Sequence, residues 1–257
     1  MSITLTRARR RAPDTMSVGA HVAELRRRLL ITAVAVAAAS SAAFVAYPQI
    51  LHWLQAPYCH VTTHCSLYVT GPLDGLSLRI HVATYAGLFL ASPVILWQVW
   101  RFVTPGLRKQ EKRYAVPFVA ASLVLFAAGA SLALVSLPHA LAFLGRVGGP
   151  TLHQIYDPNK YVGLVMALMA VFGLTFEFPV ILVALQLVGV VRPSTLAAGR
   201  RWAVVSIVAG AAVITPSGDP FSMLALALPL YVFYEVSILM GKLLGGRRAV
   251  DAGSAAL

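Results

Sequence analysis

Six long apolar runs are the feature that most restricts what this 257-residue chain can fold into. Each run is continuous and lacks the alternation of apolar and polar residues that a membrane β-barrel strand requires. Inside a bilayer, every backbone N–H and C=O group must be satisfied within the protein, so continuous runs of this kind predict helices. The sequence therefore predicts an all-α integral membrane protein with six transmembrane helices. The runs are Leu29–Tyr47, Leu76–Trp100, Tyr114–Leu137, Tyr161–Gly189, Trp202–Thr215 and Phe221–Met240.

Composition supports the same class. The chain is 58% hydrophobic and 12% charged, whereas a soluble domain has about 25% charged residues. The fifth run is too short to cross the roughly 30 Å hydrocarbon core as a straight helix. It is followed by the turn TPSGDP (215–220), so helices five and six are expected to form a short hairpin. Extension of the fifth helix through Ala197–Gly199 is the alternative.

The distribution of positive charge predicts the orientation in the membrane. All but three of the 21 lysines and arginines lie in the N-terminal stretch, the second and fourth connections, and the C-terminal stretch. By the positive-inside rule, these parts face the cytoplasm, which places both termini there and the protein in the plasma membrane. The net charge of +12 is thus an orientation signal and does not indicate a nucleic-acid binder.

The same pattern predicts the domain organisation. Residues 1–20 form a basic cytoplasmic tail, residues 21–241 form the six-helix transmembrane domain, and residues 242–257 form a short cytoplasmic tail. The basic residues before the first run, and the missing small-residue cleavage pattern, favour a retained first helix over a cleaved signal peptide.

A single acidic residue, Glu177, interrupts the fourth run, Tyr161–Gly189. A carboxylate at the bilayer centre costs at least about 2.5–3.5 kcal/mol, so such a residue is a functional-site hypothesis. Pro179 removes the backbone bond to the carbonyl of Thr175, so the helix is expected to bend there and leave a polar notch. The notch could dock a polar group of another helix.

The alternative is that Glu177 carries protons in a proton-coupled small-molecule transporter. The chain shows no inverted repeat of the kind common in such transporters. It also offers no second ionisable residue at mid-membrane depth: the nearest, Glu235, is seven residues before Lys242 and close enough to the interface to snorkel.

Enzyme motifs are absent from the sequence. It contains no GxxxxGK[ST] phosphate loop, no HExxH zinc motif and no GxSxG nucleophile elbow. We therefore expect no catalytic activity, no cofactor and no resident metal ion.

Both cysteines, Cys59 and Cys65, fall in the first outer loop, in the segment CHVTTHC. An oxidising outer compartment favours a disulfide between them. A metal site that adds His60 and His64, and free thiols, are the alternatives; adjacent ligands such as Cys59 and His60 fit one tetrahedral centre poorly.

Two glutamates lie among basic residues on the predicted cytoplasmic face. Glu24 is in HVAELRRRLL and Glu111 is in PGLRKQEKRY. Local pairing explains them at little energetic gain: Glu24 can reach Arg27 or Arg28 at helical spacing for about 0.2–0.5 kcal/mol. The functional interpretation is a two-carboxylate receptor for an incoming guanidinium, which binds carboxylate in bidentate fashion.

Four motifs, in order along the chain, resemble the TatC family of the twin-arginine protein translocase. They are HVAELRRRLL, SPVILWQVWRFVTPGLRKQEKR, FGLTFEFPV and ITPSGDPFSMLALALPLYVFYE, and the resemblance extends from about His21 to Met240. The TPSGDPFSM form and the paired cysteines look most like actinobacterial members.

The resemblance implies a concave, cupped bundle of six helices with short fifth and sixth helices. It also implies binding of twin-arginine signal peptides of folded cargo at the cytoplasmic face, assembly with TatA and TatB type single-helix subunits in an oligomeric complex, and energy from the proton motive force. It places the peptide site on Glu24 and Glu111, shaped by Leu25, Arg26, Phe102, Pro105 and Gly106. It places partner docking on Glu177 with Thr175 and Pro179, and on the fifth helix.

The chain departs from the family pattern near Glu111. Arg108 stands where the family often has tyrosine, and Lys112-Arg113 follows Glu111 where an arginine pair is usual. Arg108, three residues before Glu111, is placed to compete with the arginines of a signal peptide.

Overall fold

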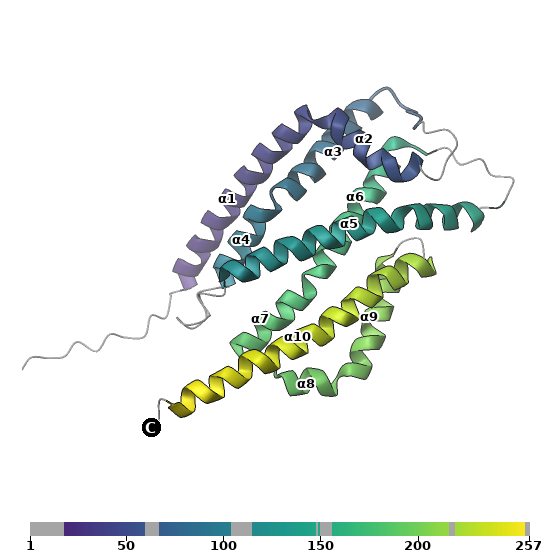
Figure 1. The fold of residues 1–257 in the computed structure, drawn as a ribbon. Helices are drawn as coiled ribbons and strands as arrows, with labels where there is room; N and C mark the ends of the chain where they lie inside the picture. The colour runs from purple at the N-terminus through teal and green to yellow at the C-terminus, as the bar shows by residue number, and fades with distance from the viewer. Residues whose placement is uncertain are drawn as a thin grey trace, which may run out of the picture.

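The computed structural model describes residues 18–59, 67–103, 115–147, 149, 156–215 and 219–254, and this part of the chain is all-helical. Figure 1 shows α1, α3 and α4 together on one side and α8, α9 and α10 on the other, with α5, α6 and α7 crossing between them. The helices are α1 (Val18–Val45), α2 (Tyr47–Cys59), α3 (Asp74–Leu90), α4 (Ser92–Val103), α5 (Ala115–Val147), α6 (Pro158–Phe176), α7 (Phe178–Val188), α8 (Pro193–Ala198), α9 (Arg200–Ile214) and α10 (Pro220–Ser254).

Four of these helices are long and apolar enough to cross a membrane. A fifth span results if α3 and α4, which meet at 47°, are counted as one bent helix. The bend falls between Leu90 and Ser92, and Pro93 occupies the first turn of α4, where proline is tolerated. An all-helical protein with four to five apolar spans is therefore established.

The fifth and sixth apolar runs form a hairpin of unequal helices. Helix α9 has 15 residues. The alternative of a continuous extension is wrong, because Gly199 separates α8 from α9. The expectation of a short sixth helix is also wrong: α10 has 35 residues and continues past the apolar run to Ser254. Apolar residues mark the membrane-embedded part of a helix, and nothing after Met240 ends it.

Close backbone approach holds the helix pairs together. Helix α1 packs chiefly on α3, and α5 packs chiefly on α6. A Cβ atom built on Gly87 would lie 2.5 Å from Cα of Ser40, and one on Gly129 would lie 2.6 Å from the carbonyl oxygen of Phe172. Only glycine fits at these two crossings.

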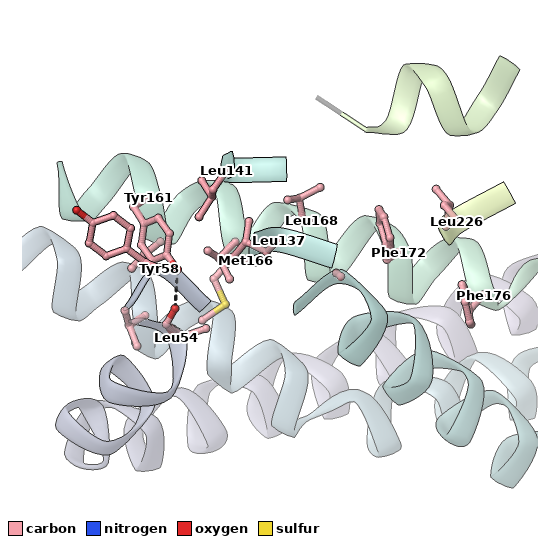
Figure 2. Close-up of a cluster of buried hydrophobic side chains, with 14 of the residues drawn as sticks. Leu54, Tyr58, Leu137, Leu141, Tyr161, Met166, Leu168, Phe172, Phe176 and Leu226 are labelled. Atoms are coloured by element: carbon pink, nitrogen blue, oxygen red, sulfur yellow. Dashed lines mark hydrogen bonds between the residues drawn. The ribbon is translucent and has the colours of Figure 1, made fainter. Parts of the chain in front are cut away.

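The largest buried cluster joins α2, α3, α5, α6, α9 and α10. Figure 2 shows this cluster, and at one end of it the hydroxyl of Tyr161 donates a 2.8 Å hydrogen bond to the carbonyl of Leu54. The ring of Tyr58 lies 5.5 Å from that of Tyr161. Helix α2, which the sequence did not indicate as an apolar run, is thus fixed over the ends of α5 and α6.

Candidate functional site

Glu24 lies on α1 in an ion pair with Arg28, one helical turn further on. Arg28 also donates from Nη1 to the carbonyl oxygen of Gln98 on α4, at 3.2 Å, so it ties the two helices together. Of the two pairings that the spacing allowed, the structure thus contains the one with Arg28. The Glu24 side chain is 27% exposed and that of Arg28 is 11% exposed, so the carboxylate remains accessible at its rim.

A pocket of about 120 Å³ opens beside this ion pair. One carboxylate faces several cationic side chains there, which makes the site a receptor for guanidinium only if an incoming cation replaces a resident one. The pocket is lined by Glu24, Arg27, Arg28, Ile31, Gln98 and Arg101.

The other residues expected at this site are placed unequally. Leu25 and Arg26 are exposed on α1. Phe102 lies in the last turn of α4, but its side chain is outside the described part of the structure. Pro105, Gly106, Arg108 and Glu111 are outside the described residues. The structure therefore brings Glu24 to the end of α4 and leaves its relation to Glu111 as a prediction.

Glu177 occupies the joint between α6 and α7, and only 8% of its surface is exposed. The helix is interrupted at this residue, two positions before Pro179, where the sequence predicts a bend. The Glu177 N–H donates to Leu174 at 3.1 Å, and its carbonyl accepts from Ile181 at 3.0 Å, so the backbone stays close to helical. Pro179 in the first turn of α7 accounts for the break because it has no N–H to donate.

The carboxyl of Glu177 has one partner that the sequence did not reveal. The hydroxyl of Ser122 on α5 is within hydrogen-bonding reach of this side chain. Ser122 is fully buried, and its Oγ accepts a 3.1 Å hydrogen bond from Nε1 of Trp100 on α4. The second carboxyl oxygen, Oε1, is buried and has no hydrogen-bond partner within the part of the chain that the structure describes.

Apolar cavities flank the α6–α7 joint. Thr175 lines one of about 520 Å³ between α6, α7, α9 and α10, although its hydroxyl donates to Val171 of its own helix at 2.6 Å. Pro179 lines another of about 370 Å³ between α5, α7 and α10. The three residues expected at the intramembrane site therefore lie at one joint, and only Glu177 presents an unsatisfied polar atom.

Glu235 is the other acidic residue considered for proton transfer. It lies on α10 and forms a salt bridge, with an N–O distance of 2.7 Å, with Arg200 at the start of α9. The hydroxyl of Tyr231, one turn earlier, also donates to it at 3.3 Å. Glu235 is thus the partner of Arg200, and its place near the membrane interface stays a prediction.

The cysteine and metal predictions rest partly on residues outside the description. Cys59 ends α2 and is not a free thiol. His60, His64 and Cys65 lie in the segment 60–66, which the structure does not describe, so the proposed disulfide stays a prediction. Among the residues that are described, no group of three or more His, Cys, Asp or Glu side chains could hold a metal ion.

Fold and site together define a class: a helical, multi-span membrane protein whose polar features are a carboxylate at a helix end and a buried carboxyl at an intramembrane joint. Within that class, the chain belongs to the TatC family, because the family model described as "Sec-independent protein translocase protein (TatC)" matches residues 20–229. The family acts within the Tat translocase complex and is not an enzyme family, which confirms the predictions of a protein-transport function and of no catalytic activity.

Individual relatives agree with this family. The Sec-independent protein translocase protein TatC of Frankia casuarinae is 38% identical over 98% of this chain and 72% of its own length. The proteins of the same name from Deinococcus radiodurans and Aquifex aeolicus are 36% and 35% identical, over 86% and 89% of this chain and 84% and 95% of their own lengths. A crystal structure of the twin arginine translocase receptor TatC matches with a TM-score of 0.71 at 36% identity, covering 87% of this chain and 98% of that chain.

Proposed function

We propose that this chain is the receptor core of a twin-arginine translocase, and that it binds the twin-arginine signal peptides of folded proteins at its cytoplasmic face. In this proposal residues 21–241 form six spans, with residues 1–20 and 242–257 as cytoplasmic tails in the plasma membrane. The fifth of these spans is α9, whose 15 residues would cross a locally thinned bilayer.

The observation that carries the receptor role is the replaceable ion pair of Glu24 and Arg28. On an exposed helix surface an ion pair at this spacing is worth roughly 0.3–0.5 kcal/mol. The Glu24 carboxylate is 27% exposed, so an incoming guanidinium can reach it and bind in bidentate fashion. Arg28 keeps its hydrogen bond to the carbonyl of Gln98 when Glu24 turns to another cation, so Arg28 stays attached to α4 after the exchange. Glu24 and Glu111 would each take one arginine of the peptide. Leu25, Arg26, Phe102, Pro105 and Gly106 would shape the site.

Partner docking is assigned to the α6–α7 joint. TatA and TatB type single-helix subunits would place a polar group against Glu177, beside Thr175 and Pro179, and the complex would be oligomeric and driven by the proton motive force. The small-molecule transporter alternative loses its support, because the chain belongs to a translocase family and Glu235 already pairs with Arg200.

Site-specific photocrosslinking from a twin-arginine signal peptide tests the receptor role. In membranes that contain the assembled translocase, Glu111→Ala is expected to abolish the crosslink, and Glu24→Gln to weaken it about tenfold, the equivalent of roughly 1.4 kcal/mol. Glu235→Gln is the matched control, since it also removes a carboxylate paired with arginine. Undiminished crosslinking in Glu111→Ala would refute the assignment.

A further inference from the structure

Three buried side chains from three helices form a continuous hydrogen-bonded series that ends at Glu177. Trp100 on α4 is 9% exposed, Ser122 on α5 is fully buried, and Glu177 at the α6–α7 joint is 8% exposed. Trp100 donates to Ser122 at 3.1 Å, and the Ser122 hydroxyl is within hydrogen-bonding reach of the Glu177 carboxyl. Neither Trp100 nor Ser122 lies at the cytoplasmic pocket around Glu24.

The chemistry of the three groups fixes the direction of the series. An indole N–H can only donate, so the Ser122 oxygen must accept from Trp100. The serine hydroxyl then has its one proton left to donate to the carboxyl of Glu177. The tryptophan ring is held in place by Phe118, whose ring centroid lies 4.8 Å away. Rotation of the serine hydroxyl is thereby restricted from both sides.

This arrangement leaves the two oxygens of Glu177 unequal. One is engaged by Ser122, while Oε1 is buried and has no partner among the described residues. An unsatisfied acceptor in an apolar environment is costly, and a hydrogen-bond donor from outside the chain would relieve that cost.

We propose that Trp100 and Ser122 are positioning residues that orient the Glu177 carboxyl, so that Oε1 faces a hydrogen-bond donor on a docked partner helix. This inference rests on the proposed docking role of Glu177. Trp100 and Ser122 do not contact the partner; they act through the carboxyl.

Infrared spectroscopy of the purified protein tests the positioning without any partner present. The carboxyl band of Glu177 is identified by its loss in Glu177→Gln. Both Ser122→Ala and Trp100→Phe are expected to shift this band, because each removes a bond in the series. Ser136→Ala is the matched control: Ser136 is also a buried serine on α5, but it donates to Ala133 of its own helix. An unshifted band in both test variants would overturn the proposal.

Crosslinking to the partner helix in the assembled complex tests whether this orientation of Glu177 strengthens docking. Ser122→Ala and Trp100→Phe are each expected to lower it roughly fivefold to tenfold, as for the loss of about one hydrogen bond. In the Glu177→Gln background, neither change should lower it further. A further loss of the same size there would show that the two residues act structurally and would overturn the proposal. Full crosslinking in Glu177→Gln alone would instead refute the docking role of Glu177, while the infrared result still decides the positioning.

Discussion

The burial of the Glu177 carboxyl lowers the stability of the folded protein. It is 8% exposed, and its Oε1 has no partner among the residues described. A buried acceptor left unsatisfied costs about 1–3 kcal/mol. Within the described part of the chain, the polar side chain that interacts with it is the uncharged Ser122. In the proposed function, a docked partner helix would relieve this cost.

Replacement of Glu177 by methionine should therefore stabilise the isolated protein and disable it. We expect Glu177→Met to raise the free energy of unfolding by about 1–3 kcal/mol, because it removes the unsatisfied acceptor. Thermal unfolding in detergent measures this change. Ser131→Ala, which removes an exposed hydroxyl bonded to its own helix, should leave stability unchanged. A destabilised Glu177→Met protein would mean that Oε1 is already satisfied at rest.

Single residues were predictable where composition alone exposed them. One acid in a run without other charges identified Glu177, and the proline two residues later identified the helix break. Ser122 and Trp100 were not predictable, because their bonds to each other and to Glu177 depend on how α4, α5 and the α6–α7 joint cross. The choice of Arg28 over Arg27 as the partner of Glu24 was open for the same reason, since both spacings bring the side chains within reach.

At the scale of elements, glycine residues at helix crossings set how closely the helices pack. Gly129 on α5 brings that helix against the backbone of α6 at Phe172, five residues before Glu177. Small residues at such crossings let backbones approach within the membrane, where van der Waals contact drives association. The position of the joint thus depends on a glycine one helix away.

A methyl group at this crossing should loosen the pair. We expect Gly129→Ala to lower the free energy of unfolding by about 1–3 kcal/mol, because its Cβ would meet backbone that cannot move aside. The measurement is again thermal unfolding in detergent. Gly163→Ala on α6 is the matched control, since a Cβ there meets nothing within 4 Å. Equal effects from the two variants would refute the importance of the crossing.

Apolar runs located the long elements well but not their ends. The runs predicted α1, α5 and the α6–α7 pair, because burial in lipid requires continuous apolar residues. They did not predict α2, which carries polar residues and Pro57 and is stabilised by contact with α5 and α6. The runs also placed the end of the sixth helix too early. Helix α10 continues beyond the apolar run, because polar residues can extend a helix as well as apolar ones.

For the whole molecule, charge asymmetry predicts an orientation that labelling can test. In a Cys59→Ser, Cys65→Ser background, Tyr68→Cys should react with a membrane-impermeant maleimide in intact cells. Thr195→Cys in α8 should react only after the cells are lysed. Both positions are exposed in the structure, so accessibility across the membrane decides the result. The reverse pattern would contradict cytoplasmic termini.

Helix α4 contacts both candidate sites, the one at Glu24 and the one at Glu177. Its Gln98 carbonyl holds Arg28, the partner of Glu24, and its Trp100, two residues later, holds Ser122, the partner of Glu177. A shift of this one helix changes both environments, so peptide and partner helix would bind with a shared coupling free energy. Such coupling is reciprocal. Whatever factor a docked partner applies to the affinity for the signal peptide, the peptide must apply to the affinity for the partner.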